Sequence, residues 1–106
     1  MEKNPDEGVA NVEVQEKLLL QLYVSGMSAN SMQAIGNVKR LCAMYVKNGF
    51  ELEIIDIYKN PLLAKEQQII FTPSLIKIFP LPRKIFIGNM SDTKKLLIGL
   101  GISNND

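Results

Sequence analysis

The segment Ile55–Gly88 carries four of the five prolines of the chain and does not commit to one secondary structure. Its middle holds a run of large apolar side chains with neither strict alternation nor a helical stripe. Pro73 interrupts this run, and Pro80 and Pro82 close it. The prolines permit a helix that ends near Phe71 or a strand that begins after Pro73, and the pattern leaves both open.

The overall composition restricts the classes of protein that the chain can form. It has 106 residues, which indicates one domain, and 46% of them are apolar, which suffices for a core without disulfides or metal. A net charge of +1 argues against nucleic acid as a partner. No apolar run approaches the length of about 18–20 residues that spans a bilayer, so no membrane partner is expected. With one cysteine and no signal-peptide pattern, we expect a cytoplasmic protein.

The first half of the folded region has the pattern of a strand, a long helix and a second strand. Residues 17–24 are rich in leucine, as a buried strand is. Apolar residues at spacings of three and four predict a helix over residues 31–48, with Asn30 as its N-cap and a left-handed stop at Gly49. Residues 50–58 predict a second strand, parallel to the first and covered on both faces in its later half.

The second half predicts two more strands and two more helices, which completes the order βαβαββα of a thioredoxin-like α/β domain. We expect this domain over residues 16–102, a mobile tail over residues 1–15 and a short tail over residues 103–106. The expected elements are a helix from Asn60-Pro61 to about Ile70, strands over residues 74–79 and 83–87, and a helix over residues 93–100 capped by Ser91-Asp92.

The chain lacks the residue sets that catalytic, metal and cofactor sites need. The redox cysteines of a thioredoxin-like fold lie between the first strand and the first helix, and residues 26–30 contain none. A dithiol oxidoreductase is therefore excluded by residue type. The one cysteine, Cys42, lies on the apolar stripe of the helix, where a free cysteine is most often a small core residue. The chain has no histidine and no phosphate-binding glycine motif. We therefore expect no catalytic residue, no metal and no cofactor.

The peptide bond before Pro73 has two interpretations. Pro73 is either an ordinary trans proline that ends the second helix, or part of the cis Thr72-Pro73 bond that thioredoxin-like domains commonly carry before their third strand. The sequence supports the two equally.

Several motifs along the chain resemble the KaiB family of circadian clock proteins. These motifs are LYVSG, IDIYKNPLLA, TPSLIKIFPLP, IGNMSD and KKLLIGL, and they follow one another from Leu18 to Leu100. The resemblance implies a protein that is not an enzyme and that has two folds, a ground-state α/β fold and a thioredoxin-like fold. It implies that the two folds differ from about the second helix onward, and that the fold balance involves Thr72, Pro73, Pro80, Pro82, Gly99 and Gly101.

The resemblance also implies partners. It predicts docking of the thioredoxin-like form on a KaiC-like ATPase, followed by binding of a KaiA-like protein or a histidine kinase. It predicts a homo-oligomer, a dimer or tetramer, for the ground-state form. Lys59, Lys77 and Lys84 are the predicted partner-binding residues.

The chain departs from the family pattern at several positions. Gln33, Glu53 and Gln68 stand where cyanobacterial members tend to have basic residues, which weakens attraction to an acidic partner. Gly101 stands where the family commonly has aspartate. A clock regulator and a relative in a stress-linked system both fit these changes. Two alternatives also stay open: an interaction module for a different partner, such as a histidine kinase or stress regulator, and a monothiol redox protein that uses Cys42.

Overall fold

A computed structural model describes residues 17–102 of the chain, and the two predicted tails lie outside the described residues. In this part of the chain a four-stranded sheet has the order β2-β1-β3-β4, with β1 parallel to β2 and the other neighbours antiparallel. The elements are β1 (Leu18–Val24), α2 (Ala29–Tyr45), β2 (Phe50–Asp56), α3 (Pro61–Glu66), β3 (Ser74–Phe79), β4 (Lys84–Ile87) and α4 (Thr93–Leu100). The predicted βαβαββα order and the thioredoxin-like class are confirmed.

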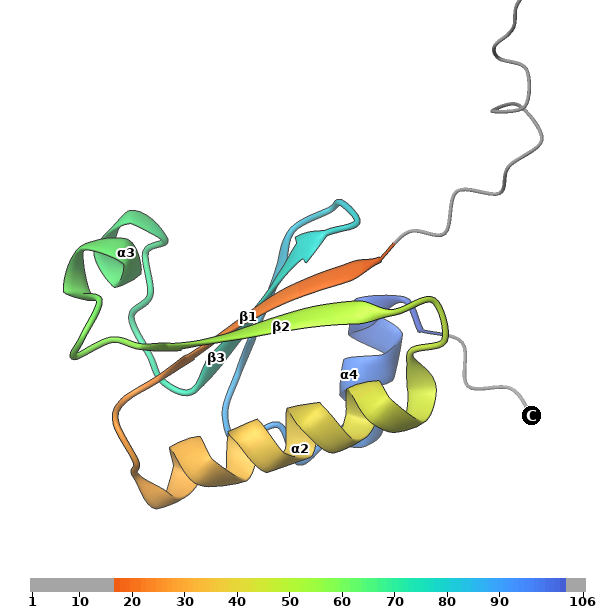
Figure 1. Cartoon of the computed structure of the whole chain (residues 1–106), viewed down its shortest axis with the longest axis horizontal. Helices are drawn as coiled ribbons and strands as arrows, with labels where there is room; N and C mark the ends of the chain where they lie inside the picture. Colours follow the sequence, from red (N-terminus) through yellow and green to blue (C-terminus); the bar gives the residue numbers. More distant parts are fainter. Residues whose placement is uncertain (1–16, 103–106) are drawn as a thin grey trace, which may run out of the picture.

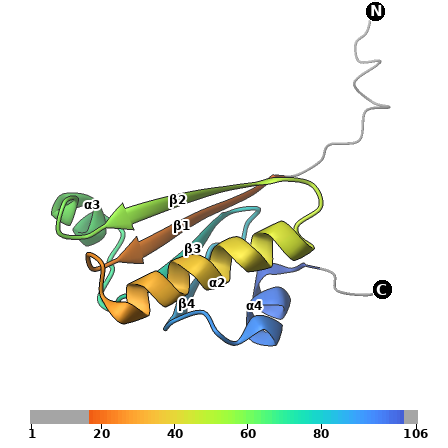
Figure 2. The same ribbon diagram turned by 60° about the horizontal axis from the view of Figure 1, so that its bottom comes forward.

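Helices α2 and α4 cover the same face of the sheet (Figure 2). Alternate residues of β1, from Leu18 to Val24, point to this face and are buried against the two helices. Leu22 and Val38 are among the fully buried side chains of this core. Burial of each such side chain contributes roughly 1.5–3 kcal/mol to folding, which makes this layer the main source of stability.

The opposite face of the sheet is covered only in part, by α3 (Figure 1). Ala64 of α3 packs with Tyr23, Ile55 and Ile76 in a second, smaller core. The later half of β2 was expected to be covered on both faces, and this prediction is wrong. Strand β2 lies at the edge of the sheet, and Ile54 keeps 38% of its surface exposed.

The bounds of α2 differ from those predicted. Ser28, not Asn30, is the N-cap: its Oγ accepts a hydrogen bond from the Ser31 N–H (3.2 Å), so the helix starts at Ala29. The helix ends at Tyr45 instead of residue 48 because Val46 is extended. Gly49 does have a left-handed φ, +96°, but it lies in the connecting loop.

Helix α3 is shorter than predicted because a left-handed residue stops it. Gln68 has φ +59°, and the N–H groups of Gln68 and Ile69 donate to the carbonyls of Lys65 and Ala64. This pair of bonds is the Schellman ending of a helix, reached here without glycine. The helix therefore ends at Glu66, and the chain is free to turn before β3.

The proline-rich segment resolves into a strand. Residues 74–79 form β3 between β1 and β4, and Leu75 and Ile76 are fully buried. The bonds Thr72-Pro73, Phe79-Pro80 and Leu81-Pro82 are all cis. The last helix begins as predicted, with Asp92 as N-cap accepting from the Lys95 N–H (3.1 Å). None of the helices within residues 17–102 has the length and apolarity needed to cross a membrane.

Candidate partner-binding surface

In the loop where a thioredoxin carries its redox cysteines, this chain has serine residues that hydrogen-bond to one another. The loop between β1 and α2 is held by Ser31, whose Oγ accepts from the Ser25 N–H (3.2 Å) and from the Ser28 Oγ (2.8 Å). Cys42 is fully buried in the core, and this burial raises the pKa of its thiol to about 11. Cys42 therefore stays protonated and shielded at neutral pH. Among residues 17–102, no group of three metal-ligating side chains gathers.

Several loops meet at the end of the sheet where β1 and β2 finish and β3 begins (Figure 1). The side chains that they expose include large apolar ones and one lysine. We call this the loop-end surface and define it by Met27, Tyr58, Lys59 and Phe71, which are all well exposed. Apolar side chains grouped at one end of a domain are the kind of feature that marks an interaction site.

Asp56 holds two of these loops together. One of its carboxylate oxygens, Oδ1, accepts from the backbone N–H of Gly26 (3.2 Å) and from that of Tyr58 (2.9 Å). The Tyr58 ring lies against Gly26, where a Cβ would be 3.6 Å from it. Asn60 Nδ2 donates to the Asp56 carbonyl (3.1 Å). The sequence offered no sign of this role, because it depends on the parallel pairing that sets the ends of β1 and β2 side by side.

The three predicted partner-binding lysines do not form one patch. Lys59 follows β2 at one edge of the sheet, and Lys84 begins β4 at the other edge. Lys77 lies directly opposite Lys84 in the β3–β4 ladder, but only 5% of its surface is exposed. In this arrangement Lys59 and Lys84 are available for contact, whereas the burial of Lys77 does not favour a direct contact.

The three positions that lack the expected basic residues are all exposed, and they lie on separate elements. Gln33, on α2, accepts from Asn89 Nδ2 (3.1 Å), which links α2 to the loop before α4. Glu53, on β2, accepts from Gln21 Nε2 (3.2 Å), and Gln68 follows α3. The positions at which positive charge is missing are therefore not clustered in one part of the surface.

The residues predicted to govern the fold balance fall in three places. Thr72 and Pro73 border the loop-end surface, and Pro80 and Pro82 form the turn between β3 and β4. Gly101 is the left-handed C-cap of α4, with φ +74°. Gly99, in α4, faces Phe86 of β4, and a Cβ on Gly99 would be 2.3 Å from the phenylalanine ring.

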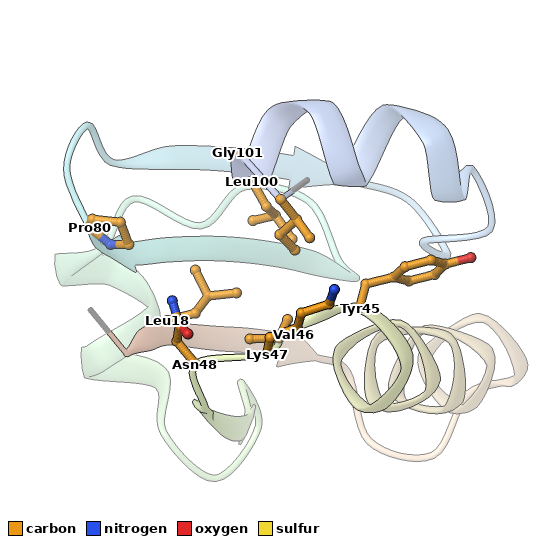
Figure 3. Close-up of a pocket in the computed structure, with 9 residues that line it drawn as sticks. Leu18, Tyr45, Val46, Lys47, Asn48, Pro80, Leu100 and Gly101 are labelled. Atoms are coloured by element: carbon orange, nitrogen blue, oxygen red, sulfur yellow. The ribbon is translucent and has the colours of Figure 1, made fainter. Parts of the chain in front are cut away.

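A cavity of about 380 Å³ lies at the other end of the molecule, between the ends of α2 and α4 (Figure 3). Leu18 and Leu100 project into the space between the sheet and the helices. Pro80 and Gly101 also line it, so two residues of the predicted fold balance meet at this cavity. The lining residues are Leu18, Tyr45, Val46, Lys47, Asn48, Pro80, Leu100, Gly101 and Ile102.

The fold and the missing thiols define a thioredoxin-like domain without a thiol redox centre. Sequence comparison makes the class more specific. The family model described as KaiB domain matches residues 21–102. The circadian clock protein KaiB3 of Synechocystis sp. is 43% identical over 86 residues, which are 81% of this chain and 84% of the relative. The circadian clock oscillator protein KaiB of Synechococcus elongatus is 42% identical over 84 residues, 79% of this chain and 82% of the relative. The chain belongs to the KaiB family of circadian clock proteins.

Comparison with solved structures agrees on the fold. The N-terminal domain of SasA from Synechococcus elongatus has a TM-score of 0.73 and 26% identity, covering 94% of this chain and 89% of that domain. The Drosophila thioredoxin Deadhead has a TM-score of 0.65 and 20% identity, covering 80% of this chain and 79% of the thioredoxin. The likeness to thioredoxin concerns the fold alone.

Proposed function

We propose that this protein is a non-catalytic regulator that docks on a KaiC-like ATPase through the loop-end surface and so adjusts a clock or clock-like timing system in the cytoplasm. The observation that carries the proposal is the family membership over nearly all of the described residues, in a thioredoxin-like arrangement. The loop-end surface supports it, because its exposed apolar side chains accompany an exposed lysine, and Asp56 joins two of its loops through the N–H groups of Gly26 and Tyr58.

The proposal is tested by mixing the full chain with the KaiC homologue of its own organism, under ATP and under ADP, and measuring complex formation by native mass spectrometry. The variant Met27→Ala removes a side chain that is 81% exposed on the loop-end surface. Its matched control is Met44→Ala, since Met44 is 63% exposed near the other end of α2. We expect Met27→Ala to weaken the complex and Met44→Ala to leave it unchanged. Absence of a complex under both nucleotides refutes the proposal.

The second candidate function is an interaction module for another protein, such as a histidine kinase, a KaiA-like protein or a stress regulator. The exposed neutral or acidic residues Gln33, Glu53 and Gln68 favour it, because they remove positive charge that would attract an acidic partner. Restoring basic residues at the three positions separates the two candidates. If the basic variant binds KaiC more tightly, the missing positive charge is what weakens that complex in the wild type. If KaiC binding does not change, and the wild type captures a different, identified partner, the second function is supported.

We also propose that the chain exchanges with a second, oligomeric fold. Support comes from the proline-rich segment, whose residue pattern permits either a helix before Phe71 or a strand after Pro73. Mass action favours an oligomer at high protein concentration. Light scattering combined with NMR across a concentration series tests this, because a dimer or tetramer with a changed amide spectrum is expected. A single spectrum and a monomer mass at all concentrations contradict it.

A further inference from the structure

A groove runs between β4 and α4, on the face of the sheet that carries the two helices. Its volume is about 480 Å³. Phe86, Ile98 and Gly99 form its apolar part, and the exposed lysines Lys84 and Lys95 flank it. Because Gly99 has no side chain, the Phe86 ring packs directly on this part of α4, in the space that a Cβ would fill. Ile98 is 71% exposed, although it lies beside this groove.

Positive charge is concentrated around the groove. Lys84, Lys94 and Lys95 all line it, and Lys77 lies directly opposite Lys84 in the ladder between β3 and β4. Like charges directly opposite each other in a sheet are destabilising. Within residues 17–102, none of these four lysines takes part in an ion pair. An anionic group in the groove would relieve this repulsion.

The carboxylate that lines the groove is already engaged. Asp92 accepts the hydrogen bond of the Lys95 backbone N–H (3.1 Å) as the N-cap of α4. It therefore stabilises the helix end. The lining still carries more positive than negative charge, because Lys84, Lys94 and Lys95 outnumber this one carboxylate. The groove has an apolar centre and a cationic border, which is complementary to an apolar side chain with carboxylates beside it.

The neighbouring strand edge indicates that the occupant is an extended peptide. In the part of the chain that the structure describes, β4 has no strand on its outer side, so its backbone groups there are available for pairing. An extended segment that adds to such an edge gains main-chain hydrogen bonds, and its alternate side chains reach one face of the sheet. A second copy of this chain is disfavoured, because it would bring the same lysine-lined edge to a groove that already carries three lysines.

We propose that the groove between β4 and α4 binds an extended acidic segment of a partner protein, with one bulky apolar side chain seated against Phe86 and Ile98. The carboxylates of the segment pair with Lys84, Lys94 and Lys95. The site is separate from the loop-end surface, and its test includes no ATPase.

The test uses the full chain and a short fluorescein-labelled peptide in which glutamates alternate with valines around one phenylalanine, measured by fluorescence anisotropy. The double variant Lys94→Glu/Lys95→Glu reverses the charge beside the groove; acidic residues in the first turn of a helix are stabilising, so α4 is preserved. We expect its affinity for the peptide to fall by about tenfold or more, a change that corresponds to at least ~1.4 kcal/mol. The control variant Lys39→Glu/Lys65→Glu has the same net charge as the double variant, but its two substitutions lie at exposed positions away from the groove, so it should bind the peptide as the wild type does.

A second pair of variants tests the apolar part. Ile98→Ser should weaken binding, whereas Leu62→Ser, an exposed leucine on α3, should not. NMR shifts on peptide addition should centre on the amides of Phe86, Ile98 and Gly99, and added salt should weaken the complex. The proposal is overturned if the peptide does not bind, if both charge-reversed variants bind alike, or if the shifts lie elsewhere. It is also overturned if the groove signals move with protein concentration alone, which would identify a second copy as the occupant.

Discussion

The C-cap of α4 provides a prediction whose size follows from backbone geometry. Gly101 has φ +74°, and its N–H donates to the carbonyl of Ile98 (3.1 Å). Apart from its two neighbours along the chain, no residue within residues 17–102 has a heavy atom within 4 Å of the position that a Cβ would take on Gly101. Replacement by alanine therefore creates no clash, and its cost is the conformational penalty of a left-handed L-residue, about 1–2 kcal/mol.

A second glycine offers a control of opposite sign. Gly36 lies inside α2 with helical backbone, and a Cβ there would meet only the end of the Arg40 side chain, at 4.0 Å. Gly36→Ala should therefore raise the free energy of unfolding by roughly 0.5–1 kcal/mol. Gly101→Asn should cost less than Gly101→Ala, because asparagine tolerates the left-handed conformation.

Thermal unfolding followed by circular dichroism measures these three variants. For a domain of this size a change of 1 kcal/mol shifts the midpoint of thermal unfolding by roughly 4–8 °C, so the two alanine variants should be well separated on either side of the wild type. If Gly101→Ala is as stable as the wild type, or more stable, the left-handed cap does not limit the stability of the populated fold. The same result would indicate that the second, proposed fold is the one being measured.

Three further predictions concern the loops and the core. Ser28→Ala should lower the free energy of unfolding by about 1 kcal/mol, whereas Asn30→Ala should change it little, since Ser28 is the N-cap of α2; chemical denaturation compares the two. Asp56→Ala removes the acceptor of the Gly26 and Tyr58 N–H groups and should cost about 1–3 kcal/mol, with faster amide exchange at both residues. Burial raises the pKa of Cys42 to about 11, so Cys42 should react with a thiol reagent only after unfolding, and rapid labelling of the native protein would contradict this. The free energy of unfolding should also fall as the pH rises from about 9 through about 11, because the thiol ionises first in the unfolded chain.

The candidate site was predictable only where it depends on residue type. The absence of cysteine from residues 26–30 and the apolar neighbourhood of Cys42 are properties of the sequence, and both survive in the structure. The grouping of lysines is not such a property. Lys77 and Lys84 are adjacent through the β3–β4 ladder, and Lys59 is remote from both because β2 and β4 are the two edges of the sheet.

The helix ends also differ in whether the sequence could predict them. The start of α4 was predicted because Asp92 is a strong local capping residue. The start of α2 was misplaced by two residues because both Ser28 and Asn30 suit the N-cap, and only the bonded arrangement with Ser31 chooses between them. The end of α3 was missed because a left-handed glutamine is a rare stop that no local pattern indicates.

By itself the sequence determined the order of strands and helices, the lack of thiol redox chemistry and the resemblance to the KaiB family, since each depends on short-range pattern and residue type. The tertiary structure decided how the proline-rich segment folds. Its local preferences are balanced, so pairing of residues 74–79 with β1 and β4, and the burial of Leu75 and Ile76, outweigh them in favour of a strand. The contact of Phe86 with Gly99 beside the groove likewise depends on the tertiary structure, because it joins residues that lie on two separate elements, β4 and α4.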